Sequence, residues 1–142
     1  MTGIQALLAF AAWTLLLPMI YAGYRTLLVL TGKSRADAWT RGKTTNDPEF
    51  ITRTSHAHMN CVENLPVFAA VVLASVALGQ AAVVDALACV FIAARIAQSV
   101  THMIAVNHWM VFLRANFFFV QVGLIFYWVW KLCCAVAPVA NV

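Results

Sequence analysis

Long apolar segments follow one another along most of this sequence, and one extended polar stretch separates the first segment from the second. The segments cover, to within a few residues, positions 4–30, 50–78, 81–106 and 109–136. A transmembrane helix needs about 20 mostly apolar residues, and each segment is longer than that. The pattern predicts an all-α integral membrane protein, a four-helix transmembrane bundle in which residues 1–142 form a single domain.

The connections between these segments differ in length. Residues 31–49 contain Gly32 and the run Asn46-Asp47-Pro48, which are loop signals. Gly79-Gln80 and Asn107-His108 mark much shorter turns. Because a very short turn joins antiparallel neighbours, we expect the second and third helices to pack against each other.

The composition supports a bilayer environment. Hydrophobic residues make up 63% of the chain and charged residues 10%, whereas a soluble domain carries about 25% charged residues. A water-soluble fold of this size would be unable to bury so much apolar surface. The first apolar segment has no basic start and is too long for a cleaved signal peptide, so we expect it to stay in the mature protein.

The basic residues are concentrated beside one loop. The net charge is +4, and the cations in or next to residues 31–49 are Lys33, Arg35, Arg41, Lys43 and Arg53. By the positive-inside rule, this loop is expected to be cytoplasmic and both termini to lie outside. Since membrane spans bracket the basic stretch, we interpret it as a topology signal and expect no nucleic-acid partner.

No metal site or disulfide framework is predicted. The cysteines, Cys61, Cys89, Cys133 and Cys134, form no C-x-x-C pair, and most lie inside apolar runs. His56 and His58 point to different faces of a helix, which makes them a poor pair of metal ligands. The sequence also lacks a Ser-His-Asp set and a glycine-rich phosphate loop.

Polar residues form a stripe on the second predicted helix. At about 100° per residue, with Arg53 set at zero, the others lie between roughly −80° and +20°. They are His56, Asn60, Glu63 and Asn64. On the third helix the stripe contains Arg95, Gln98, Ser99 and His102, and on the fourth it contains Arg114 and Gln121. We call the three stripes together the polar seam.

The charges of the polar seam do not balance. Arg53, Arg95 and Arg114 stand against Glu63, with Asp85 further away. An anionic ligand would correct the imbalance, because arginine binds carboxylates bidentately. In the alternative interpretation, Glu63 pairs with Arg95 or Arg53 and merely joins helices. Arg53 and Arg114 would then snorkel toward the membrane surface.

The run RTSHAHMNCVENLP over residues 53–66 resembles the helix-two signature of the MAPEG family, the membrane-associated proteins of eicosanoid and glutathione metabolism. That signature reads roughly E-R-x-x-R-A-H-x-N-x-x-E-N-x-P-F. The shared residues are Arg53, Ala57-His58, Asn60, Glu63-Asn64 and Pro66, with Phe68 nearby. The length and the long first loop agree, so the resemblance covers essentially the whole chain.

The resemblance implies a homotrimer that binds glutathione between adjacent subunits near the cytoplasmic side, as in microsomal glutathione transferases. Arg114 resembles the arginine that faces the thiol and is our candidate catalytic residue. The residues expected to bind glutathione are Arg35, Arg53, His56, Asn60, Glu63, Arg95, Gln98 and His102. Glutathione is thus the expected co-substrate, and lipophilic small molecules or lipids are the expected partners.

Some positions depart from the family pattern. The second arginine of the helix-two signature is His56, a helix-three tyrosine is His102, and a helix-four tyrosine corresponds to Phe118. These changes argue against a specialised eicosanoid synthase. They leave three functions open: a glutathione transferase or peroxidase active in detoxification, a non-catalytic lipid-binding or scaffold protein of the same fold, and a purely structural bundle.

Overall fold

The structure is a computed structural model that describes residues 1–40 and 46–136. Its elements are α1 (Gly3–Leu30), the short 3-10 helix η1 (Ala36–Trp39), α2 (Glu49–Ala77), α3 (Ala81–Asp85), α4 (Ala88–Ile104) and α5 (His108–Val136). Within the described residues there is no β-strand. The first, second and fourth predicted segments therefore appear as single helices with nearly the expected bounds.

The third predicted segment differs, because it is divided into α3 and α4 by a turn at Ala86-Leu87. Asp85, the last residue of α3, accepts a hydrogen bond at 2.6 Å from the backbone N–H of Gly3 in α1. A carboxylate is favourable at this position because the first N–H groups of a helix have no partner within the helix.

Helices α1, α2 and α5 are each long and apolar enough to cross a membrane, whereas α4 is a shorter apolar helix of 17 residues. A fourth crossing by α3 and α4 together remains a prediction.

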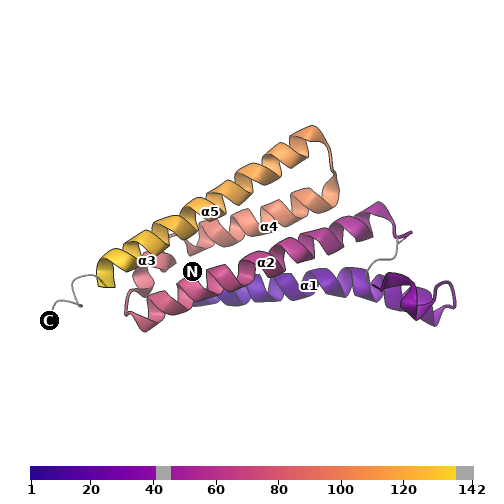
Figure 1. Ribbon diagram of the computed structural model, residues 1–142, viewed down its shortest axis with the longest axis horizontal. Helices are drawn as coiled ribbons and strands as arrows, with labels where there is room; N and C mark the ends of the chain where they lie inside the picture. Colours follow the sequence, from indigo (N-terminus) through magenta and orange to yellow (C-terminus); the bar gives the residue numbers. More distant parts are fainter. Residues whose placement is uncertain (41–45, 137–142) are drawn as a thin grey trace.

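The helices are arranged as two neighbouring pairs. Helix α1 packs along α2, α4 packs along α5, and α2 and α4 contact each other between the pairs. Figure 1 shows the pairs diverging toward the end where η1 and the turn between α4 and α5 lie. We call this the loop end; the turn between α2 and α3 lies at the opposite end.

An aromatic cluster joins the two pairs. Phe68 of α2 stacks on Phe91 of α4 with ring centroids 4.0 Å apart. Phe10 of α1 and Trp128 of α5 both lie within 6.1 Å of these two rings. All four side chains are buried, and aromatic pairs at such distances stabilise a core beyond their burial alone.

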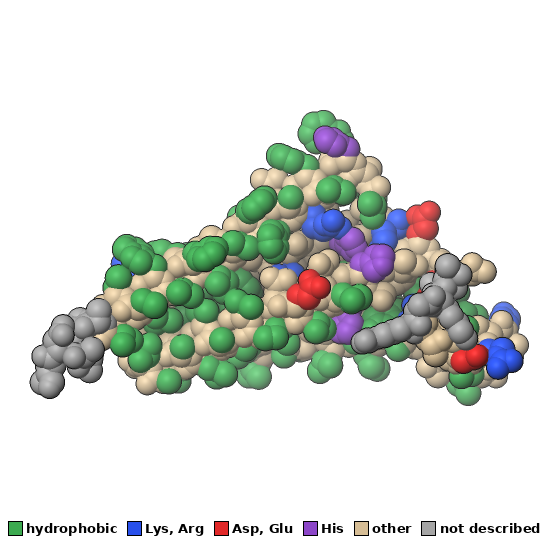
Figure 2. All heavy atoms as spheres, viewed as in Figure 1, with side chains coloured by type: hydrophobic (Ala, Val, Ile, Leu, Met, Phe, Trp, Pro, Cys, Tyr) green, Lys and Arg blue, Asp and Glu red, His purple; other side chains and the backbone are tan. Residues whose placement is uncertain are grey.

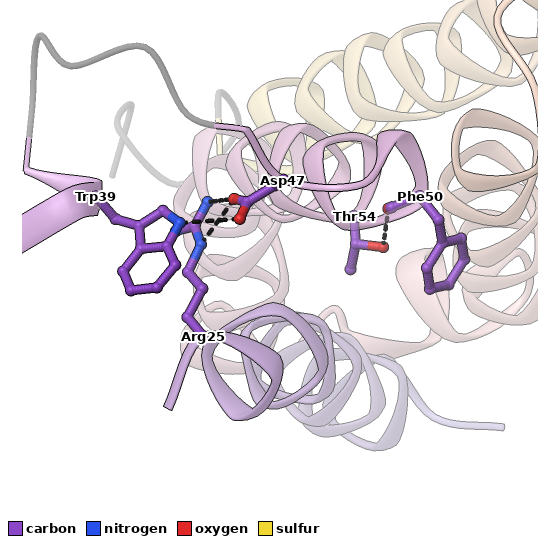
Figure 3. A network of polar contacts seen from close by, with 5 residues as sticks. All are labelled: Arg25, Trp39, Asp47, Phe50 and Thr54. Carbon is purple, nitrogen blue, oxygen red and sulfur yellow. Dashed lines mark hydrogen bonds and ion pairs between the residues drawn. The ribbon is translucent and has the colours of Figure 1, made fainter. Parts of the chain in front are cut away.

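A second group of contacts holds the polar connection after α1. Arg25 donates from Nε and Nη2 to Oδ2 of Asp47 at 3.0 and 2.7 Å, and Trp39 Nε1 donates to Oδ1 of Asp47 at 2.9 Å. Figure 3 shows Arg25 reaching from α1 to Asp47 with the Trp39 ring beside it. These contacts, here called the Asp47 clamp, tie both described parts of the connection to the end of α1.

Candidate functional site

Polar side chains of α2, α4 and α5 converge toward the loop end. Figure 2 shows arginine or lysine and histidine side chains gathered there, while apolar side chains are spread over the remaining face. A cavity of about 270 Å³ lies between these helices, and we call it the polar cavity. Its lining residues are Asn60, Gln98, Val111, Arg114, Ala115 and Phe118. The structure thus brings together three predicted site residues: Asn60, Gln98 and Arg114.

Arg114 contacts His102 on the neighbouring helix α4. The contact joins Nη1 of Arg114 to Nδ1 of His102. Arginine can only donate hydrogen bonds, so Nδ1 of His102 accepts, and the ring proton of neutral His102 lies on Nε2. Nε2 is buried without a hydrogen-bond partner among the described residues. His102 therefore orients the Arg114 guanidinium and leaves one N–H donor of its own unused.

Arg53 and His56 lie on α2 close to this pair. The ring of the exposed His56 lies 6.1 Å from that of His102, measured between centroids. Arg53 donates from Nε to the carbonyl oxygen of Met103 at 3.0 Å and pairs through Nη1 with Glu49 at 2.8 Å. Arg53 thus satisfies a carbonyl at the end of α4, and its Nη2 has no partner among the described residues.

Glu63 is exposed on α2 and forms no hydrogen bond or ion pair within the described part of the chain. The interpretation that Glu63 joins helices by pairing with Arg95 or Arg53 is therefore not realised within one chain. A carboxylate on a membrane-spanning helix normally has a partner, because hydrocarbon does not solvate charge. Among the described residues Glu63 therefore has no such partner, which leaves it available to a ligand, to water or to another chain.

Arg95 does not line the polar cavity. Only 1% of this residue is exposed. Nη1 donates to the carbonyl oxygen of Asn60 at 3.4 Å, and the guanidinium lies over the Phe10 ring at 5.2 Å. Nε and Nη2 have no partner among the described residues. Arg95 therefore packs among α1, α2 and α4, and its role toward glutathione stays a prediction.

Arg35 lies outside the cluster, on the connection that follows α1. It is exposed and donates from Nε to Asp37 at 2.9 Å. Within the part of the chain that the structure describes, no hydrogen bond or ion pair joins it to the other predicted site residues, so its expected role in binding a carboxylate also stays a prediction. The described residues contain no group of three or more His, Cys, Asp or Glu side chains able to hold a metal ion.

The structure also reveals site residues that the sequence analysis placed on polar stripes without assigning them a role. Nε2 of Gln121 donates to Oε1 of Gln98 at 3.0 Å. Asn64 donates to the carbonyl oxygen of Asn60 at 2.8 Å. Gln121 and Asn64 line a second cavity beside the polar cavity. Gln121 lies on the same helical face as Arg114, and Asn64 lies on the same face as Asn60. This spacing was the sequence signal that they belong near the site.

The comparison with known families decides which class of protein carries this site. The profile of the MAPEG family matches residues 4–134, nearly the whole chain. This chain belongs to the MAPEG family. No curated protein and no solved structure gave a match. The three membrane-length helices and the family together make this MAPEG protein an integral membrane protein. The family indicates a function of the membrane glutathione transferase or eicosanoid type.

Proposed function

We propose that this MAPEG protein is a membrane-bound glutathione transferase or peroxidase that acts on lipophilic electrophiles in detoxification. The observation that carries the proposal is the polar cavity, where Arg114 lies beside Asn60 and Gln98. Conjugation of glutathione, a charged thiol compound, to an apolar molecule requires a fixed cation, polar groups and a location in the membrane.

Arg114 is proposed to stabilise the glutathione thiolate. A thiolate is the nucleophile in such reactions, and a neighbouring cation favours it over the thiol. His102 is unsuited to act as the base because its Nδ1 already accepts from Arg114. The thiol proton therefore leaves to water. The thiolate sulfur then forms a bond to the electrophilic carbon, and the leaving group departs with the electron pair of the broken bond.

The remainder of glutathione would contact polar groups around the cavity. Arg53, with one unused nitrogen, would bind a carboxylate, and Glu63 would bind the ammonium group. The exposure of Glu63 supports a site completed by a neighbouring subunit. Arg35 of that subunit would supply a second carboxylate contact. We therefore propose a homotrimer with glutathione between adjacent chains.

A lipid-binding or scaffold function without catalysis is the second candidate. An apolar groove of about 510 Å³ lies toward the end opposite the polar cavity and favours this candidate. Its lining residues are Ala70, Val71, Ala74, Leu78, Val129, Leu132, Cys133 and Val136. The departures at His56, His102 and Phe118 also fit a protein that has lost catalysis.

Calorimetric titration of glutathione into the purified protein in detergent tests the proposal. We expect Glu63→Gln to weaken binding about 10-fold, since it removes a charged hydrogen bond to the ammonium group. The matched ligand control is N-acetylglutathione, which lacks that ammonium group and should bind wild type and variant equally.

Unchanged glutathione affinity in Glu63→Gln, with the assembly intact, would assign Glu63 to helix association. Wild-type protein that binds no glutathione would reject the transferase and favour the lipid-binding candidate.

A further inference from the structure

A second cavity of about 200 Å³ lies between α2, α4 and α5, and we call it the apolar cavity. Its lining residues are Asn64, Val67, Phe91, Gln121, Val122, Ile125 and Phe126. The side chains of Gln98 and Gln121 are hydrogen-bonded to each other, and Gln98 lines the polar cavity while Gln121 lines the apolar one. The two cavities are therefore neighbours separated by one pair of amides.

The lining of the apolar cavity suits a hydrocarbon group. Five of its lining side chains are aliphatic or aromatic, and the two polar ones are Asn64 and Gln121. Removing apolar surface from water is favourable, so these walls favour an apolar ligand. Phe91 belongs to the buried aromatic cluster, so the inner wall of the cavity is part of the packed core.

The amide of Gln121 has a defined orientation. Its Nε2 donates both to Oε1 of Gln98 at 3.0 Å and to the carbonyl oxygen of Phe117 at 2.8 Å. A carbonyl oxygen can only accept, so the nitrogen must face Phe117, and both N–H bonds are used. The remaining atom, Oε1, is buried without a hydrogen-bond partner among the described residues.

Asn64 is the second polar residue of this cavity. One N–H of its Nδ2 donates to the carbonyl oxygen of Asn60, which leaves Oδ1 to accept and the second N–H to donate. Asn64 can therefore both accept and donate, whereas Gln121 offers the cavity only an acceptor. A buried acceptor without a partner is unfavourable, and a ligand that donates one hydrogen bond would satisfy it.

We propose that the apolar cavity binds the lipophilic second substrate, and that Gln121 selects molecules that carry one hydroxyl or N–H donor beside an apolar group. The assignment to a substrate rests on the proposed function, because the adjoining polar cavity holds Arg114. Gln121 is then a specificity-determining residue, and an apolar molecule of equal size without a donor binds more weakly.

Binding of a matched probe pair tests this inference without glutathione. The probes are 4-butyl-3-fluorophenol and its methyl ether, which differ in one donor, and binding is followed by fluorine NMR in detergent. We expect wild-type protein to bind the phenol about 5- to 10-fold more tightly, after correction for micelle partitioning, since one neutral hydrogen bond distinguishes the pair.

Gln121→Met keeps the length of the side chain and removes the acceptor, so it should abolish the preference. Gln80→Met makes the same change at an exposed turn and should leave the preference intact. Equal binding of the two probes by wild type, or a preference that survives Gln121→Met, would overturn the inference.

A second variant covers the case in which Gln121→Met does not assemble. Val122→Trp adds bulk from the cavity wall without removing an amide, and it should abolish binding of both probes. Undiminished binding would place the probes elsewhere and overturn the inference. Failure of the proposed function looks different: the probe preference persists while glutathione conjugation is absent.

Discussion

Three arginines of the polar seam have different surroundings although their sequence signals are alike. Arg95 is enclosed by apolar helices and lies over Phe10. Arg53 is engaged by a backbone carbonyl and by Glu49. Arg114 lines the polar cavity and is oriented by a neutral histidine, His102. Of the three, Arg114 alone lines that cavity, where a fixed positive charge can act on a ligand.

Arg114→Ala should lose most of the thiolate ultraviolet absorbance that develops when glutathione is titrated into the wild-type protein at neutral pH. Turnover of a generic aryl halide should fall in parallel, by roughly 10- to 1000-fold, because the variant removes one charge contact to the transition state. Stopped-flow absorbance and steady-state kinetics measure the two effects.

His102 supplies the matched control for this prediction. His102→Asn offers an amide oxygen near the position of Nδ1 and should retain much of the thiolate signal, whereas His102→Ala should lower it. Full activity in Arg114→Ala would transfer thiolate stabilisation to another cation, with Arg53 the first candidate.

At the scale of elements, the loop end is organised by polar contacts and the opposite end by apolar packing. The Asp47 clamp joins Trp39 and Arg25 to the residue that precedes Pro48, just before α2 begins. The Asp47 side chain is 3% exposed and that of Arg25 is 22% exposed. A carboxylate so deeply buried depends on its partners.

Asp47→Ala should therefore lower the midpoint of thermal unfolding in detergent. The expected loss is about 2 kcal/mol, less than that of a fully buried pair because Arg25 keeps some contact with solvent. Asp37→Ala, which alters an exposed ion pair, should change the midpoint less. Equal shifts in the two variants would show that the clamp contributes no special stability.

The connection between α1 and α2 and the turn between α4 and α5 must lie on the same side of the membrane if all four predicted spans cross it. We predict that this side is cytoplasmic, because of the loop cations, and that both termini are outside. Single cysteines introduced at Thr40 and near the C-terminus in a cysteine-free background should react with an impermeant thiol reagent from opposite sides. Labelling of both from the cytoplasmic side would reject this topology.

At the scale of the whole molecule, large apolar side chains are exposed along α1, α2, α4 and α5, as expected for a protein in a bilayer. Against that background, Glu63 and His56 are polar residues of α2 that are exposed. Ionisable groups in such a position normally face a bundle interior or a water-filled cavity. One chain alone does not enclose them, which supports association through this face of α2.

We predict three copies of the chain in native mass spectrometry from a mild detergent. Glu63→Gln should leave that stoichiometry unchanged if Glu63 binds ligand and does not hold the assembly together. A stable wild-type monomer that still binds glutathione would contradict the shared-site arrangement.

The sequence by itself determined the helical class, the approximate bounds of three long helices and the family. Apolar runs and the motif over residues 53–66 are local signals, and the bilayer turns each long apolar run into a helix because backbone groups need partners there. The helical spacing also predicted that Asn60 and Gln98 belong to one polar seam, and Arg114 was assigned by resemblance; the structure places all three around the polar cavity.

Only the tertiary structure decided which polar residues meet and which partners they have. A helical wheel gives the direction of Arg95 but not the phenylalanine of α1 that covers it. The wheel also gives the stripe that contains Gln121. It does not show that the amide nitrogen of Gln121 donates to the side-chain oxygen of Gln98. The turn at Ala86-Leu87 and the absence of a partner for Glu63 among the described residues were equally undetermined. These features depend on distances between separate helices, and the packing of the whole chain sets those distances.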